Sequence, residues 1–307
     1  MHKSPCLTAL AAALAFAAPP SAHAAITIQE LFDGMALDTT INGQGGSATS
    51  IGLSGTWAVN SGDTIYTANN FNVQPLPGLS PQGGDLGGVW KGGGGDWSTA
   101  IWATRPLTSP VDFSIDSTVY FSVRLNNTGD TATGFGFSSG SAAASEFAGV
   151  GTHWDNHTDL NSAEARNSLY STWGTLDQDL AGNNDGPYAM RAHTAEGSVN
   201  GRALVVGRLT TSAGGSDSLD LKLYFDGDTI DNNLGTIAWS LSDSFASSMS
   251  ASHLLIWANG NGNGELDAIR VGQTWEDVTG VALVPEPASG MLTLLGSLAL
   301  LRRRRRC

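Results

Sequence analysis

Apolar and polar residues alternate along two well-separated stretches of the chain, 118–125 and 219–225. Every second residue in each stretch is apolar, and these positions are Val119, Phe121, Val123, Leu125, Leu219, Leu221, Leu223 and Phe225. In the second stretch the opposite face carries Asp220, Lys222 and Tyr224. Alternation with a period of two and one polar face is typical of an antiparallel strand.

Similar short runs, rich in β-branched and aromatic residues, recur between clusters of Gly, Asn, Asp and Ser. They predict strands at 51–59, 118–125, 203–209, 219–225, 234–239, 253–258 and 266–271. Only 141–147 and 162–170 suit a helical turn or two. Because strands do not alternate with long helices, a parallel α/β fold is disfavoured. We therefore predict an all-β fold, an antiparallel jelly-roll β-sandwich, over residues 25–280.

The first 24 residues have the three zones of a secretory signal peptide. Lys3 supplies the positive charge, residues 7–18 are apolar, and Ala22-His23-Ala24 provides the small residues of a cleavage site. A buried N-terminal helix is the alternative, but Pro19-Pro20 interrupts the segment. We expect cleavage between Ala24 and Ala25.

The last segment, 281–307, joins a short motif to an apolar run and a basic block. Pro285, Glu286 and Pro287 precede fourteen uncharged residues at 288–301, and the chain then continues with Arg302, Arg303, Arg304, Arg305 and Arg306. Fourteen helical residues reach ~21 Å, short of the ~30 Å hydrocarbon core of a bilayer. By the positive-inside rule the arginines stay in the cytoplasm and the body lies outside.

This order of parts resembles the PEP-CTERM sorting signal of Gram-negative bacteria. The resemblance implies transient anchoring in the inner membrane and processing by an exosortase-type peptidase. It also implies export to the cell surface or to an extracellular matrix in an organism that makes exopolysaccharide. Cys307, which follows the arginines, departs from the pattern. The resemblance says nothing about the activity of the rest of the chain.

Composition and charge narrow the classes of function. Among 307 residues, 14% are charged, 41% are hydrophobic and 39 are glycine, which excludes a disordered chain, a helical bundle and a collagen. The two ends hold six of the 15 basic residues and one of the 28 acidic ones, so the body keeps 9 basic and 27 acidic residues and a net charge of about −18. This charge argues against nucleic acid as a partner. The body also lacks cysteine and therefore any disulfide.

Three groups of residues in the body carry a second resemblance. They are 31–33, 42–46 and 52–57 near the start, 204–208, 217–221 and 223–225 in the middle, and 266–272 and 275–278 at the end. In this order they resemble a family of exported proteins with a concanavalin-like, laminin-G-like jelly roll. The resemblance implies one exported domain of that fold, in a family whose functions are mostly unassigned. Asp226-Gly227 replaces the family's Asn-Pro, and 149–200 has no counterpart.

Sandwiches of this shape include β-glucanase-type glycosidases, which carry Glu-x-Asp-x-x-Glu on one strand. Glu265 and Asp267 match the first two positions, but Arg270 occupies the third, and a guanidinium cannot protonate a leaving group. An ion pair beside the last strand is the favoured interpretation. Gly136-Phe137-Ser138-Ser139-Gly140 fits a nucleophile elbow, which needs a parallel sheet that the pattern does not predict. A glycoside hydrolase or lyase with a different site is the alternative function.

Two oxygen-rich stretches could hold Ca²⁺. One is an EF-hand-like series in which Arg270 replaces the bidentate Glu, and the other is an acidic turn; their residues are Asn259, Asn261, Asn263 and Asp267, and Asp226, Asp228 and Asp231. The alternatives are a flexible Asn-Gly hairpin turn for the first stretch and a solvated turn for the second. His153 and His157 would converge on a metal only in a helix, and their neighbours indicate a loop.

Trp90 and Trp97 flank a glycine-rich segment that includes Asp96. Aromatic rings in such loops stack on sugar faces, and carboxylates accept bonds from sugar hydroxyls. Tryptophan is more often buried, and Trp102 lies in a strand-like run. The leading hypothesis is thus an exported, non-enzymatic surface or matrix protein associated with exopolysaccharide, with Trp90, Trp97 and Asp96 as candidate glycan-binding residues.

Overall fold

The computed structural model describes part of the chain in detail. The described residues are 27–32, 35–36, 39–45, 50–60, 65–68, 88–91, 101–128, 131–154, 168–176, 190–195, 199, 202–214, 216–225, 227–260 and 263–283. The signal peptide with its Ala24–Ala25 cleavage site and the sorting motif with its apolar run and arginines lie outside these residues. Within the described part, no helix has the length and apolar character needed to cross a bilayer.

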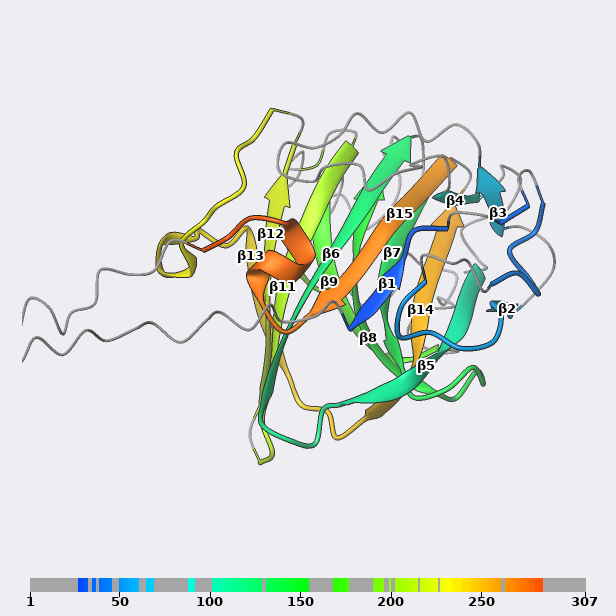
Figure 1. Ribbon diagram of the computed structural model, residues 1–307, viewed down its shortest axis with the longest axis horizontal. Coiled ribbons are helices and arrows are strands. Elements are labelled where there is room, and N and C mark those ends of the chain that lie inside the picture. Colours follow the sequence, from blue (N-terminus) through cyan, green and yellow to red (C-terminus); the bar gives the residue numbers. More distant parts are fainter. Residues whose placement is uncertain are drawn as a thin grey trace, which may run out of the picture.

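Two antiparallel sheets form the described part of the protein (Figure 1). Sheet I consists, in spatial order, of β13 (Leu241–Phe245), β12 (Asp217–Tyr224), β11 (Arg202–Thr211), β6 (Ser117–Thr128), β15 (Asn263–Gly272), β4 (Gly88–Lys91) and β3 (Ile65–Ala68), with β1 (Ile28–Glu30) also paired to β15. Sheet II consists of β10 (Met190–His193), β9 (Ser168–Thr175), β8 (Glu146–Trp154), β7 (Thr131–Ser138), β14 (Ser250–Gly260), β5 (Ile101–Asp112) and β2 (Ala58–Val59).

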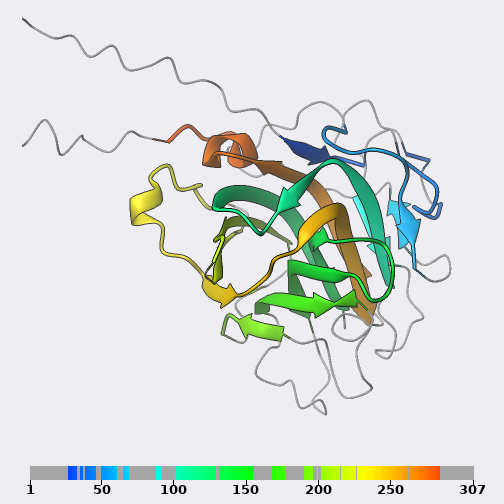
Figure 2. The same ribbon diagram turned by 90° about the horizontal axis from the view of Figure 1, so that it is seen from below.

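The sheets lie face to face, and their facing side chains form the main core (Figure 2). Phe121 and Val123 of β6 and Leu221 of β12 are buried there, as the alternation in these strands predicts. They meet Phe135 and Phe137 of β7 from the other sheet. The prediction of an all-β antiparallel sandwich is therefore confirmed.

The outer face of sheet I is not polar throughout, because a short helix covers part of it. The helix α1 (Trp275–Thr279) places Trp275 edge-on against Tyr120, with ring centroids 6.3 Å apart. The Trp275 indole N–H donates to the Asp231 carbonyl at 2.8 Å. Tyr120, Trp275 and Tyr224 belong to a second apolar cluster on this outer face. Tyr224 is buried there, although the alternation in its strand predicts a polar face.

Several predicted elements differ from the structure. Residues 51–59 form only the two-residue strand β2 and two isolated bridges, because Gly52 and Gly55 have positive φ angles of 68° and 60°. Residues 234–239 contain the short 3₁₀ helix η3 (Leu234–Thr236), which begins where the Asn233 side chain accepts a bond from the Gly235 N–H. No strand forms there, because the Asn233 side chain accepts a backbone N–H that a neighbouring strand would otherwise bond.

Neither stretch predicted as helical forms a helix where the structure describes it. The segment 141–147 is a turn followed by the start of β8, and 168–170 belongs to β9, while 162–167 lie outside the described residues. The strands β7 and β8 escaped prediction because glycines occupy alternate positions in both, at 134, 136, 149 and 151. Glycine has no side chain to display a period of two.

Candidate functional site

The polar residues near the start of β15 bond to the neighbouring strand β6 of sheet I. Asp267 forms an ion pair with Arg124 of β6, with 3.9 Å between carboxylate and guanidinium, and both side chains are buried. Glu265 accepts a bond from the Asn126 amide at 2.5 Å. The ion pair predicted beside the last strand is confirmed, with Arg124 as its basic partner.

The EF-hand-like series does not lie in a hairpin. Asn259 pairs with Ala132 in sheet II, whereas Asn263 pairs with Thr128 in sheet I, so the connection crosses between the sheets. The predicted Asn-Gly hairpin turn is therefore wrong, because β14 and β15 belong to different sheets. Asn261 lies outside the described residues, and the Asp267 carboxylate also accepts the Ala268 N–H at 2.6 Å.

In the acidic turn after β12, the described carboxylates accept hydrogen bonds from residues close in sequence. Asp228 accepts the Phe225 N–H, and Asp231 accepts the Tyr224 hydroxyl, each at 2.8 Å. Burial, together with this carboxylate, raises the pKa of Tyr224. Asp226 lies outside the described residues. In the part of the chain that the structure describes, no three carboxylate, imidazole or thiol groups converge as metal ligands, and Ca²⁺ binding stays a prediction.

The serine and histidine motifs lack the local structure that their chemistry requires. Ser138 ends β7 in an antiparallel sheet, and its buried hydroxyl donates to the Gly140 carbonyl at 2.6 Å. The nucleophile-elbow interpretation is therefore contradicted. His153 is a buried residue of the strand β8 and not of a helix, while His157 lies outside the described residues.

The predicted glycan-binding residues are placed only in part. Trp90 belongs to β4, where its backbone lies opposite Glu265 of β15 and Tyr66 of β3. Trp97 and Asp96 lie outside the described residues, so binding through this loop stays a prediction. Trp102 is a buried residue of β5, as its strand-like surroundings predict.

A line of aromatic residues and glycines that the sequence did not reveal crosses the outer face of sheet II. Neighbouring strands pair Trp102 with Trp257, Trp257 with Gly134, Gly134 with Gly151, Gly151 with Tyr170, and Tyr170 with His193. The Trp257 indole N–H donates to the Tyr170 hydroxyl at 3.1 Å. Trp257 is 1% exposed and Tyr170 is 0% exposed. These aromatic residues therefore form a buried cluster and not an open surface.

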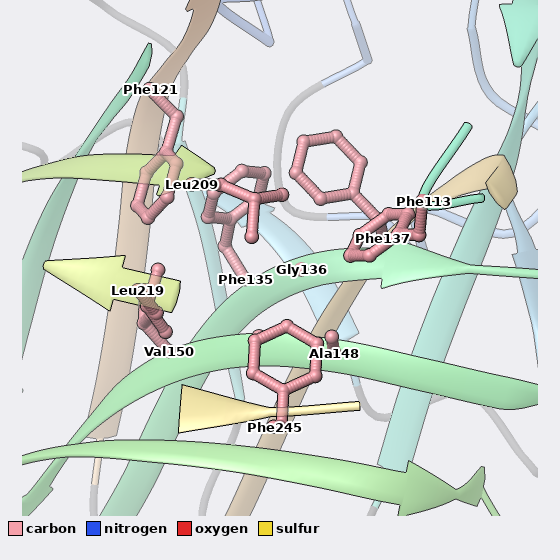
Figure 3. Close-up of a pocket in the computed structure, with 11 residues that line it drawn as sticks. Phe113, Phe121, Phe135, Gly136, Phe137, Ala148, Val150, Leu209, Leu219 and Phe245 are labelled. Atoms are coloured by element: carbon pink, nitrogen blue, oxygen red, sulfur yellow. The ribbon is translucent and has the colours of Figure 1, made fainter. Parts of the chain in front are cut away.

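A small cavity lies inside the main core (Figure 3). The rings of Phe113, Phe121, Phe135, Phe137 and Phe245 surround it, and its volume is about 20 Å³. A space of this size holds about one water, and its lining is apolar. It is a gap in the packing and has no room for a sugar.

A much larger hollow of about 740 Å³ opens where β5 turns away from sheet II. Its lining comes from β5, β6, the end of β15 and the N-terminal segment, and consists of Thr27, Ile28, Gly52, Thr108, Ser109, Pro110, Val111, Asp112, Ile115, Ser117, Thr118, Val119, Thr211, Val271, Gly272 and Gln273. Figure 1 shows the end of β5 passing below the ends of β1 and β15 in that view. All of these residues belong to the described part.

The wall from β5 exists because this strand leaves its partner. Pro106 pairs with His253 and Val111 with Ala251, so residues 107–110 face one residue of β14. Pro106 and Pro110 have no N–H to donate to a ladder. The Thr108 N–H instead donates to the Gly52 carbonyl at 2.9 Å.

The N-terminal wall depends on a glycine and on a buried ion pair. A Cβ atom on Gly52 would lie 2.0 Å from the Thr27 carbonyl oxygen, so only glycine fits there. Glu30 of β1 forms an ion pair with Arg105 of β5, and both are buried. Burial raises the pKa of Glu30, and the Arg105 guanidinium opposes that rise. The pair links β1 of sheet I to β5 of sheet II.

The hollow offers free hydroxyls next to aliphatic surface. Within the described residues, no protein group bonds the side-chain hydroxyls of Thr108, Ser109 and Thr118. Ile115 is 51% exposed. Asp112 is the one carboxylate among the described lining residues, and bonds from the Ser114 hydroxyl and N–H lower its pKa. This mixture can bind a ligand that carries both hydroxyls and C–H surface.

Comparison with known proteins assigns the chain to no family. No family model matches the chain, and no curated protein matches it. Among solved structures, an endo-β-1,4-glucuronan lyase from the fungus Trichoderma reesei aligns with a TM-score of 0.38 and 11% identity, over 69% of this chain and 92% of that one. The Ca²⁺-bound exoplasmic/lumenal domain of VIP36 aligns with a TM-score of 0.38 and 11% identity, over 76% of this chain and 89% of that one.

A glycosyl hydrolase family protein from Mycobacterium fortuitum also aligns with a TM-score of 0.38 and 11% identity, over 80% of this chain and 99% of that one. At TM-scores this far below 0.5, these likenesses carry no argument about this chain. The fold described above rests on the strand pairing alone.

Proposed function

We propose that this protein is an exported, non-enzymatic jelly-roll protein of the surface or extracellular matrix of a Gram-negative bacterium, where it binds polysaccharide. The sequence of both ends supports export and sorting: a signal peptide cleaved after Ala24, and Pro285-Glu286-Pro287 followed by an apolar run and five arginines. An exosortase-type peptidase processes the second signal after transient anchoring in the inner membrane.

The open hollow beside β5 carries the binding part of the proposal. Its volume of about 740 Å³ lies within the ~300–1,000 Å³ usual for ligand sites. Sugars present hydroxyls around a ring whose faces carry C–H groups. The hydroxyls of Thr108, Ser109 and Thr118, which bond to no other group within the described residues, suit the sugar hydroxyls. The exposed aliphatic side chain of Ile115 suits the C–H faces of the ring.

Binding fits the hollow better than hydrolysis does. A glycoside hydrolase usually places two carboxyl groups on either side of the scissile bond, one as acid and one as nucleophile or base. The part of the lining that the structure describes contains a single carboxylate, Asp112. A hydrolase or lyase would therefore need residues other than those that line this site.

Electrophoresis of the purified full-length chain in mild detergent, through native gels cast with the host's own exopolysaccharide, tests the proposal. We expect retardation that the free polysaccharide reverses, without release of reducing ends or unsaturated sugar. Unchanged mobility would refute polysaccharide binding. Release of sugar products would instead establish the enzyme.

Export and sorting have a separate test in a host that carries an exosortase. We expect the native chain to appear outside the cell without residues 1–24, and a chain lacking 285–307 to lose its surface location. If both chains reach the same place, the sorting proposal is wrong.

A further inference from the structure

We propose that the hollow beside β5 selects an uncharged polysaccharide over a polyuronate or another polyanion. This inference rests on the proposed binding function and specifies its ligand class. It follows from the charges of the lining, from the charge of the whole body and from the side chains available for contact.

Among the described residues that line the hollow, none has a basic side chain. Its sixteen residues include one ionisable group, the Asp112 carboxylate. The Ser114 hydroxyl donates to this carboxylate at 2.6 Å and the Ser114 N–H at 2.8 Å, and both bonds lower its pKa. The hollow therefore carries a negative charge at neutral pH. Recognition of carboxylates in proteins usually relies on arginine or lysine, and neither is found among the described lining residues.

The charge of the body acts in the same direction. Without the two ends, 27 acidic residues stand against 9 basic ones. A net charge of this size repels a polyanion over distances up to the Debye length, which is about 10 Å at 0.1 M salt. A polyuronate would thus meet repulsion at the surface and no compensating cation from the lining that the structure describes.

The available contacts suit a neutral, hydroxylated chain. Thr108, Ser109 and Thr118 offer hydroxyls, each able to donate one bond and accept two, and the amide of Gln273 both donates and accepts. Ile115 and Val111 supply aliphatic surface beside them. Such groups satisfy the hydroxyls and the C–H faces of an uncharged sugar without burying an unpaired charge.

Native gels cast with different polysaccharides test the inference on the full-length chain. The uncharged probes are a soluble β-glucan and a galactomannan, and the polyanion is polygalacturonate, all with EDTA present so that Ca²⁺ cannot bridge two anions. Ser109→Trp and Thr118→Trp each place an indole at a lining position, the first on β5 and the second on β6. Thr229→Trp adds the same ring at an exposed position outside the hollow and is the matched control.

We expect at least one uncharged polysaccharide to retard the native chain and the control. We expect both hollow-filling variants to lose at least tenfold in affinity, and polygalacturonate to cause no retardation. Retardation by polygalacturonate alone would overturn the ligand class and leave polysaccharide binding intact. Equal retardation of all variants would overturn the hollow as the site. If no glycan, including the host exopolysaccharide, retards the chain, the proposed function itself fails.

Discussion

At the scale of single residues, glycines determine how the outer face of sheet II is covered. A Cβ on Gly134 would lie 2.1 Å from Cζ2 of Trp257, and one on Gly149 would lie 2.6 Å from Cη2 of the same ring. A Cβ on Gly151 would lie 2.6 Å from the Tyr170 hydroxyl. The indole therefore lies directly on the backbone of β7 and β8, and this close approach explains why these strands carry glycine.

Gly134→Ala should destabilise the protein, because the added methyl group forces Trp257 out of a packed layer. Overpacking of this kind typically costs ~1–3 kcal/mol in the free energy of unfolding. Gly214→Ala is the matched control, since nothing lies within 4 Å of its Cβ position. Urea unfolding of the two variants should differ clearly, and equal midpoints would contradict the close approach.

His253 makes the stability of the protein depend on pH. Its ring lies 2.8 Å from the Ser252 hydroxyl, and burial lowers its pKa below the usual 6.5. The folded chain thus binds the proton less readily than the unfolded chain does. The stability linked to His253 is complete above about pH 6.5 and falls as the pH drops towards the lowered pKa.

His253→Gln should therefore show a smaller loss of melting temperature between pH 7.5 and pH 5.5 than the native protein. Thermal unfolding followed by circular dichroism at several pH values measures both slopes. Thr229→Ala, at an exposed position, should keep the native slope. If the melting temperatures of His253→Gln and of the native protein fall by the same number of degrees, His253 is not the source of the pH dependence.

At the scale of elements, the helix α1 shows how a short segment gains stability from its ends and from one anchor. The Thr274 side chain caps the first turn, the Asp277 side chain returns a bond to the cap, and Gly280 ends the helix in a left-handed conformation. Five residues form no stable helix alone. The burial of Trp275 against Tyr120 therefore holds α1 on sheet I.

Trp275→Ala should cost ~3–5 kcal/mol in the free energy of unfolding, as for other buried aromatic residues reduced to alanine. It should also expose Tyr120 and Tyr224, which pack in the same cluster. Glu276→Ala changes an exposed residue of the same helix and should have little effect. Denaturant unfolding distinguishes the two, and similar midpoints would show that α1 is not anchored through Trp275.

The elements also show which parts of the fold could be predicted from the sequence. The strands β6, β11, β12, β14 and β15 carry large apolar residues at regular positions, and the pattern finds them. In β7 and β8 glycines occupy outward positions, because the rings of Trp257 and Tyr170 lie directly on the backbone. The alternation of apolar and polar side chains is therefore lost in these two strands. The segment 51–59 has strand-like composition, yet the positive φ angles of Gly52 and Gly55 bend it away from a ladder.

At the scale of the whole molecule, the hollow was beyond prediction because its walls are far apart in sequence. The walls come from residues 27–28, Gly52, 108–112, 115, 117–119, Thr211 and 271–273, which meet only after both sheets have formed. Pro106 and Pro110 are the local signal that β5 leaves its ladder, but prolines do not show what the freed strand will face. Motifs of the concanavalin-like resemblance, 52–57 and 266–272, supply Gly52, Val271 and Gly272 to the lining.

We propose that this exported β-sandwich binds uncharged polysaccharide in the hollow beside β5. The most direct test is the affinity of the full-length chain for an uncharged polysaccharide, measured by electrophoretic retardation for the native protein, Thr118→Trp and Thr229→Trp. We expect retardation of the native chain and of Thr229→Trp, and its loss in Thr118→Trp. Equal retardation of all three chains, or retardation of none, would contradict it.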